Sequence, residues 1–183
     1  MITLFVDASH CPNTHAAGYG AWAIQDGWEK GKVFGGRISK EVLNSGEAEI
    51  CGIVEAVKYL RAHKLMGDNV IMIQSDSHRA LQLVILALPH TEIKQHKDSK
   101  DWGMSNIRPT PTEQWAITQL TNDLGLMAFI YVRHIKGHSD GDGRNWVNRQ
   151  CDRVAREQMY KERQKRGHKQ QKPKFRVDRE RFK

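Results

Sequence analysis

The 183-residue sequence has no long hydrophobic run and only three cysteines. It contains no stretch of about 18 consecutive apolar residues, so it predicts no membrane-spanning helix. The amino-terminal residues lack the basic start and the small-residue cleavage site of a secretory signal peptide. Cys11, Cys51 and Cys151 form an odd set without metal-ligand spacing, which favours a reducing compartment. We therefore expect a cytoplasmic protein, with Cys51 and Cys151 as small residues of the core.

The net charge of +8 is unevenly distributed along the chain. Residues 161–183 contain 11 lysines and arginines and 3 acidic residues, so this segment accounts for the whole positive excess. We expect one domain over residues 1–160 and a basic tail over residues 161–183, helical at first and disordered beyond. Such a tail favours contact with the phosphates of nucleic acid, an attraction that is independent of base sequence and weakened by salt. The alternative is a solvated end that only keeps the protein soluble.

The hydrophobic pattern predicts three strands followed by alternating helices and strands. Strands are expected at residues 2–9, 18–25, 31–39, 70–75 and 127–134. Helices are expected after Asn44, at residues 78–87 and 112–124, and from about residue 147. Asn44 with Glu47 resembles a capping box, and Thr112 is the expected cap of the third helix. The sequence thus predicts an α/β fold, a mixed five-stranded sheet with three antiparallel strands and then two parallel ones, flanked by helices.

Four carboxylates stand out by their positions in these elements. Asp7 and Asp76 each close a hydrophobic run, at the place where open α/β sheets carry their chemistry. Glu49 and Asp152 are each expected near the start of a helix, the second one after a glycine-rich loop. Carboxylates that converge on one point raise one another's pKa unless a cation offsets their charge, and oxygen ligands select Mg²⁺ or Mn²⁺. The pattern is typical of a metal-dependent nuclease.

Four motifs in the right order resemble ribonuclease H of the small type 1 class, and the resemblance covers nearly all of residues 1–160. The first motif is Val6-Asp7-Ala8-Ser9, followed by Asn13 and by Gly18-Tyr19-Gly20-Ala21. The second is Asn44-Ser45-Gly46-Glu47-Ala48-Glu49-Ile50, and the third is Ser75-Asp76-Ser77. The fourth is His134-Ile135-Lys136-Gly137-His138-Ser139, followed by the segment from Asn148 to Arg156, which contains Asp152.

The resemblance implies hydrolysis of the RNA strand of RNA–DNA hybrids by two Mg²⁺ ions, for which Mn²⁺ can substitute. The products would carry 5′-phosphate and 3′-hydroxyl ends. Asp7 would bridge both ions, Glu49 and Asp76 would hold one of them, and Asp152 would hold the other. Glu49, and not the nearby Glu47, matches the catalytic glutamate. His138 matches the loop histidine of the family, which assists proton transfer or product release.

The resemblance also implies a set of substrate contacts, directed at the 2′-hydroxyl groups that distinguish RNA from DNA. Asn13, Ser45, Gly46 and His78 stand at the matching positions, and only Asn13 keeps the residue type of the family. The basic residues between positions 94 and 108 correspond to a protrusion with which some relatives hold the hybrid; a solvated loop is the alternative. The sequence departs from the family pattern at two places. Ala8 stands where glycine is common, and the loop between His138 and Asp152 is longer than usual.

Several histidines and aromatic residues show no functional pattern of their own. His10, His15 and His134 lack zinc spacing with any cysteine, and we expect them to be structural or exposed. Trp22 and Trp115 are expected in or beside the core.

Other functions remain open on the sequence alone. The same fold serves transposases, integrases, junction resolvases and exonucleases, and fold does not determine function. The chain could instead be a nucleic-acid-binding module without activity, although four mutually repelling carboxylates argue against this. A third alternative is a partner-binding subunit whose tail docks elsewhere. The leading hypothesis is a monomeric hybrid endonuclease that binds the nucleic-acid backbone through its tail.

Overall fold

The computed structural model describes residues 1–66, 70–93, 106–135 and 143–166. Its elements are β1 (Ile2–Cys11), β2 (Ala16–Gln25), β3 (Lys32–Arg37), α1 (Ser45–Ala62), β4 (Val70–Ser75), α2 (His78–Ala87), β5 (Glu92–Ile93), α3 (Pro111–Leu124), β6 (Phe129–His134) and α4 (Gly143–Lys165). Within the described ranges, no helix has the length and apolar character needed to cross a membrane.

The strands form one mixed sheet in the order β3-β2-β1-β4-β6-β5. β1, β2 and β3 are antiparallel neighbours, whereas β4 runs parallel to β1 and β6 runs parallel to β4. The predicted architecture of three antiparallel strands followed by two parallel ones is confirmed. The sequence did not predict β5, a two-residue strand parallel to β6, because two residues are too few to show an alternating pattern.

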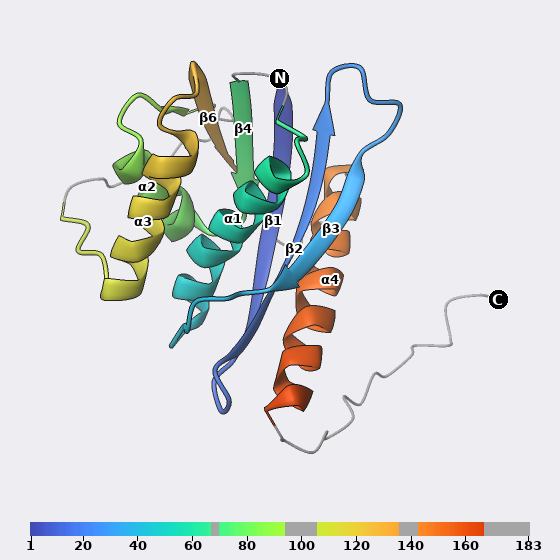
Figure 1. Cartoon of the computed structure of the whole chain (residues 1–183), viewed down its shortest axis with the longest axis vertical. Helices are drawn as coiled ribbons and strands as arrows, with labels where there is room; N and C mark the ends of the chain where they lie inside the picture. The colour runs from blue at the N-terminus through green and yellow to red at the C-terminus, as the bar shows by residue number, and fades with distance from the viewer. Residues whose placement is uncertain (67–69, 94–105, 136–142, 167–183) are drawn as a thin grey trace.

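Helices cover both faces of the sheet, with α1, α2 and α3 on one side and α4 on the other (Figure 1). Successive residues of a strand point to opposite faces, and β1 shows this clearly. Val6 lies against Gly52 of α1, while Phe5 packs in a separate cluster with Val147 and Cys151 of α4. The centre of the sheet is therefore buried on both sides.

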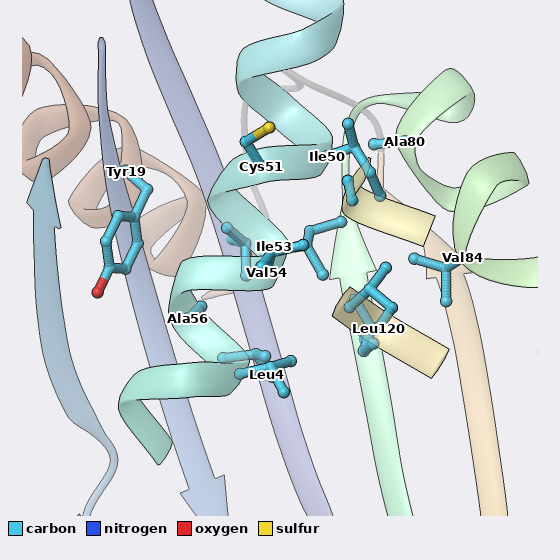
Figure 2. Packing of buried hydrophobic residues seen from close by; sticks show 14 of the residues in the cluster. Leu4, Tyr19, Ile50, Cys51, Ile53, Val54, Ala56, Ala80, Val84 and Leu120 are labelled. Carbon is cyan, nitrogen blue, oxygen red and sulfur yellow. The ribbon is translucent and has the colours of Figure 1, made fainter. Parts of the chain in front are cut away.

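The main core lies between α1 and the sheet, with α2 and α3 closing it (Figure 2). The apolar face predicted for the first helix is fully buried, at Ile50, Ile53, Val54, Val57 and Leu60. Cys51 and Cys151 are buried free thiols, as predicted. Trp22 and Trp115 pack against the two clusters as half-buried residues, which also agrees with the prediction.

Two helix starts differ in detail from the predicted caps. Asn44 Oδ1 accepts a hydrogen bond from the backbone N–H of Glu47, as expected for the first half of a capping box. The Glu47 carboxylate, however, accepts from the N–H of Leu43 and not from that of Asn44. The prediction of Thr112 as the cap of α3 is wrong, because Thr110 caps this helix and Pro111 fills its first position. Proline suits that position, since its ring fixes φ and its missing N–H would have no partner there.

Helix α4 begins earlier than predicted, at Gly143, and continues through Lys165. Asp152 therefore lies well inside the helix and not near its start, which corrects the prediction. Sequence reasoning placed Gly143 in a loop, because glycine usually disfavours a helix, and so it missed the first helical turn. At the other end Glu162 is buried, and Arg166 Nη1 donates to the carbonyl oxygen of Thr14 over 2.9 Å. This hydrogen bond holds the end of α4 next to the β1–β2 turn.

Two glycines of β2 allow α4 to lie directly on the sheet. A Cβ atom at Gly20 would stand 2.0 Å from the carbonyl oxygen of Cys151, and one at Gly18 would stand 2.5 Å from the backbone nitrogen of Met159. No side chain can occupy either position without moving the helix. Gly20 is also the cross-strand partner of Asp7. The close approach at Gly20 therefore brings the segment Cys151–Asp152 toward Asp7.

Substitution of Gly20 by alanine should lower the free energy of unfolding by about 1–3 kcal/mol, because the new methyl group meets helix backbone that cannot give way. Urea unfolding followed by circular dichroism would measure the change. Gly36→Ala is a matched control, since its methyl group would meet only the ring of Tyr19 at 3.3 Å. Equal stability of the Gly20→Ala protein and the wild type would contradict the close packing described.

Candidate metal centre

Neighbouring parallel strands bring Asp7 and Asp76 to the same level of the sheet. The pairing of β1 with β4 extends to Phe5 and Gln74, and each aspartate follows two residues after this pair. Asp76 directly follows β4, as expected. Asp7 does not end its strand, because β1 continues to Cys11 in pairing with β2. Asp7 instead lies just beyond the last residue of β1 that pairs with β4.

The first turns of α1 add Glu49 to these two aspartates. One carboxylate oxygen from each of Asp7, Glu49 and Asp76 lies within 4.8 Å of the others. Asp7 is buried, and Oε2 of Glu49 is shielded from solvent and has no hydrogen-bond partner among the described residues. A buried acceptor without a donor is costly, so this arrangement suits a bound cation.

The electrostatics of the cluster also favour the binding of a positive charge. Burial and the charges of Asp76 and Asp152 raise the pKa of Asp7 from 3.8 to about 7, although a hydrogen bond from the Ala8 backbone and the charge of Arg156 oppose this. Burial and the charges of Asp7, Asp76 and Asp152 raise the pKa of Glu49 well above its usual value. A divalent ion would relieve this repulsion, and three oxygen ligands match the preference of Mg²⁺ or Mn²⁺.

Asp152 lies beside this cluster and not within it. Its charge raises the pKa of both Asp7 and Glu49, so it belongs to the same electrostatic neighbourhood. Its carboxylate accepts a hydrogen bond from Nε of Arg156, one helical turn further along α4, over 2.7 Å. The structure thus gathers three of the four predicted carboxylates and holds the fourth nearby in an ion pair with arginine.

Glu47 takes no part in the cluster. Its buried carboxylate accepts hydrogen bonds from the Leu43 N–H over 2.8 Å and from the Thr110 hydroxyl over 2.7 Å. Glu47 is a structural residue, and Glu49 is the acidic residue of α1 that faces the aspartates.

Two histidines lie next to Asp76. Nε2 of His134 is 2.9 Å from the carbonyl oxygen of Asp76 and donates a hydrogen bond to it. The ring of His78, at the start of α2, meets that of His134 edge to face at 5.0 Å between centroids, and burial and His134 lower the pKa of His78. Sequence reasoning assigned no function to His134. The parallel pairing of Ser75 with His134 is what brings it to the site, and this pairing is not visible in the local sequence.

The remaining predicted site residues divide into two groups. Asn13 is exposed in the β1–β2 turn, and Ser45 and Gly46 lie in the first turn of α1. The end of β1 lies close to the segment before α1, because the His10 ring interacts with the Val42 backbone and the charge of Glu47. His138, the long loop before α4 and the lysines between positions 94 and 100 lie outside the described residues.

A mixed α/β sheet with a carboxylate cluster next to its central parallel strands defines a class, that of α/β domains with an acidic metal centre. The sequence model of the ribonuclease H family matches residues 1–160. The chain belongs to the ribonuclease H family, as its motifs predicted, and is a ribonuclease H enzyme by family. No curated protein sequence gives a significant match.

Solved structures agree with this assignment at the level of the fold. Ribonuclease H1 from the halophilic archaeon Halobacterium salinarum superimposes with a TM-score of 0.59 at 13% identity, covering 87% of this chain and 98% of that one. The amino-terminal ribonuclease H domain of Rv2228c from Mycobacterium tuberculosis, solved as a fusion with maltose-binding protein, gives 0.60 at 15% identity, covering 90% and 96%. LC11 ribonuclease H1 in complex with an RNA/DNA hybrid gives 0.53 at 15% identity, covering 88% and 98%.

Asp7→Asn should flatten the pH dependence of stability in the metal-free protein. The pKa of Asp7 is raised from 3.8 to about 7 in the folded state, so the folded protein holds this proton more tightly than the unfolded chain does. The stability that this proton contributes is fully present below about pH 4 and is lost as the pH rises through 7. Urea unfolding in the presence of a chelator should show the wild type losing roughly 2–4 kcal/mol more than the variant between pH 4 and pH 8.

Glu29→Gln serves as the control, because Glu29 is exposed between β2 and β3 and is not a member of the cluster. This variant should follow the wild-type profile. Parallel profiles for Asp7→Asn and the wild type would show that burial and the neighbouring carboxylates do not raise the pKa of Asp7 as described.

Proposed function

We propose that this protein cuts the RNA strand of RNA–DNA hybrids, with metal ions held by Asp7, Glu49, Asp76 and Asp152. The observation that carries the proposal is the gathering of Asp7, Glu49 and Asp76 in a chain of the ribonuclease H family. The hybrid bound in the LC11 ribonuclease H1 structure supports this substrate class. The alternatives are another nuclease of the same fold and a nucleic-acid-binding module of weak activity.

The donor set suits two Mg²⁺ ions, with Mn²⁺ able to replace them. The orphaned oxygen of Glu49 and the raised pKa of Asp7 support a cation at this point. When bound, such ions activate water and stabilise the charge on the leaving oxygen of an in-line displacement. Asp7 would bridge the ions, Glu49 and Asp76 would hold one, and Asp152 would hold the other after exchanging its contact with Arg156. No covalent nucleophile of the protein is needed, and the products would carry 5′-phosphate and 3′-hydroxyl ends.

Other residues would bind the substrate and move protons. Asn13 in the β1–β2 turn, and Ser45 and Gly46 in the first turn of α1, would contact the 2′-hydroxyl groups of the RNA strand. His78 lies beside Asp76 through its contact with His134, so it could contact the same strand close to the cut. We assign proton transfer or product release to His138.

The domain boundary and the location belong to the proposal as well. Residues 1–160 would form the catalytic domain and residues 161–183 the basic tail, of which the first part continues α4. The three cysteines are free thiols, which supports a reducing compartment such as the cytoplasm. We expect a monomer.

Cleavage of a strand-labelled RNA–DNA hybrid tests the proposal, beside RNA–RNA and DNA–DNA duplexes and single strands, with Mg²⁺ and with a chelator. The wild type should cut only the RNA of the hybrid and only with metal. Asp7→Asn keeps the shape of the side chain but removes a charge that the ions need, so it should lower the rate by at least about 10³-fold. Hybrid binding without cleavage would favour the binding module, and cleavage of DNA would favour another nuclease.

Removal of residues 167–183 tests the tail without cutting into α4. This segment contains seven basic and two acidic residues. The shortened protein should bind the hybrid on the order of tenfold more weakly at low salt and show a flatter dependence of affinity on salt, because fewer counterions are released. Fluorescence anisotropy at several salt concentrations would measure this. An unchanged salt slope would show that the tail does not bind phosphates, and the cleaved strand should stay the same.

A further inference from the structure

We propose that a polar network at the start of α3 positions Glu49 and Asp76 for metal binding, although α3 carries none of the site carboxylates. The network consists of Glu47, Arg79, Thr110 and Glu113, and we call it the Thr110 network. It connects the first turns of α1, α2 and α3. The inference deepens the proposed function and rests on it, since it concerns the same metal centre.

The network reaches α1 through Glu47. The hydroxyl of Thr110 donates to Oε1 of Glu47 over 2.7 Å, and Oε2 of Glu47 accepts from the Leu43 N–H over 2.8 Å. Only 3% of Glu47 is exposed, so these two donors replace water around its carboxylate. Glu47 and Glu49 are two residues apart in the same helix, and their side chains point in different directions. The contact with Thr110 thus anchors the backbone that carries Glu49.

The network reaches α2 through an ion pair between the partly exposed Arg79 and the buried carboxylate of Glu113. Nε and Nη2 of Arg79 donate to the two oxygens of Glu113 over 3.0 and 2.7 Å, and Nη2 also donates to the carbonyl oxygen of Arg108. Burial opposes ionisation of Glu113, but hydrogen bonds from Arg79 and the Thr110 backbone, with the charge of Arg79, lower the pKa of Glu113. Arg79 lies three residues after Asp76. The ion pair therefore anchors the β4–α2 turn that carries this aspartate.

Thr110 joins the two halves of the network. Its backbone N–H donates to Oε2 of Glu113 over 2.8 Å, and its side-chain oxygen accepts from the Glu113 N–H over 3.2 Å. The same side-chain oxygen bears the proton given to Glu47. One hydroxyl thus both caps α3 and connects it to α1. Loss of this hydroxyl would leave a buried oxygen of Glu47 without its donor and would release the first turn of α1.

Metal binding should be sensitive to this release. Carboxylate oxygens must stay within about 0.5 Å of their productive positions to bind an ion well, and their supporting contacts determine this. Glu49 and Asp76 come from separate elements, and the Thr110 network supplies side-chain hydrogen bonds that join α1 and α2 to α3 at this end of the helices. The network is therefore a set of positioning residues that act on metal affinity through Glu49 and Asp76.

Thr110→Val is the direct test, and Thr121→Val is its matched control. Thr121 lies on the same helix, and its hydroxyl is within hydrogen-bond distance of two carbonyl oxygens, that of Ala87 at the other end of α2 and that of Ile117 in its own helix. Both variants lose one hydroxyl that joins α3 to a neighbouring helix, but only the first one breaks the Thr110 network. Calorimetric titration of the full chain with Mn²⁺ reports metal affinity without any substrate, at a temperature where circular dichroism shows each variant folded.

Thr110→Val should bind Mn²⁺ about tenfold more weakly than the wild type, in the range found for contacts that support metal ligands. Thr110→Ser restores the hydroxyl and should restore the affinity, and Thr121→Val should match the wild type. If Thr110→Val does not fold, Arg79→Lys serves in its place. Lysine keeps the charge but not the two-pronged contact with Glu113, so this variant should also bind Mn²⁺ more weakly.

Wild-type affinity in folded Thr110→Val would overturn the proposal, and so would an equal loss in Thr121→Val, which would indicate a general effect of helix stability. Absence of Mn²⁺ binding by the wild type would overturn the metal centre itself and the inference with it. Normal Mn²⁺ binding by the wild type, with loss in Thr110→Val alone, would support the positioning role even if the substrate proved to be other than a hybrid.

Discussion

Mutual repulsion among Asp7, Glu49 and Asp76 is the constraint on which the rest of the structure depends. Three carboxylates within 4.8 Å of one another, partly removed from water, raise the free energy of the folded chain. Such an arrangement persists only if the surrounding packing is strong enough to maintain it. The extensive core between α1 and the sheet provides that packing, and a divalent cation would remove the repulsion. The residues that could hold a metal are thus the same ones whose repulsion destabilises the metal-free fold.

Contacts outside the cluster decide how its members meet. The glycines of β2 allow α4 to lie on the sheet, which places Asp152 near Asp7. Arg156 then acts as an internal counter-ion, since it pairs with Asp152 and its charge lowers the pKa of Asp7. On the opposite face, the Thr110 network joins the helix starts next to Glu49 and Asp76. The site therefore depends on packing from both layers of helices.

Local periodicity in the sequence was sufficient for most of the fold. The apolar spacing from Ile50 to Leu60 predicted α1, and the hydrophobic pattern predicted five strands in their correct arrangement. Predictions were weaker at the ends of elements, where a single interaction decides the boundary. Thr110 and not Thr112 caps α3 because Pro111 occupies the first helical position. The early start of α4 was similarly hidden by glycines, which sequence reasoning assigned to a loop.

The sequence by itself determined the family, the order of the elements and the identity of the acidic residues, because each of these is expressed in short motifs with regular spacing. Only the tertiary structure decided that three of the acids share one site while Asp152 pairs with Arg156, and that Glu47 binds Thr110, sixty-three residues away. It also brought His134 to the backbone of Asp76. These contacts join residues distant in the chain, and they depend on how helices pack on a sheet. No local pattern encodes that packing.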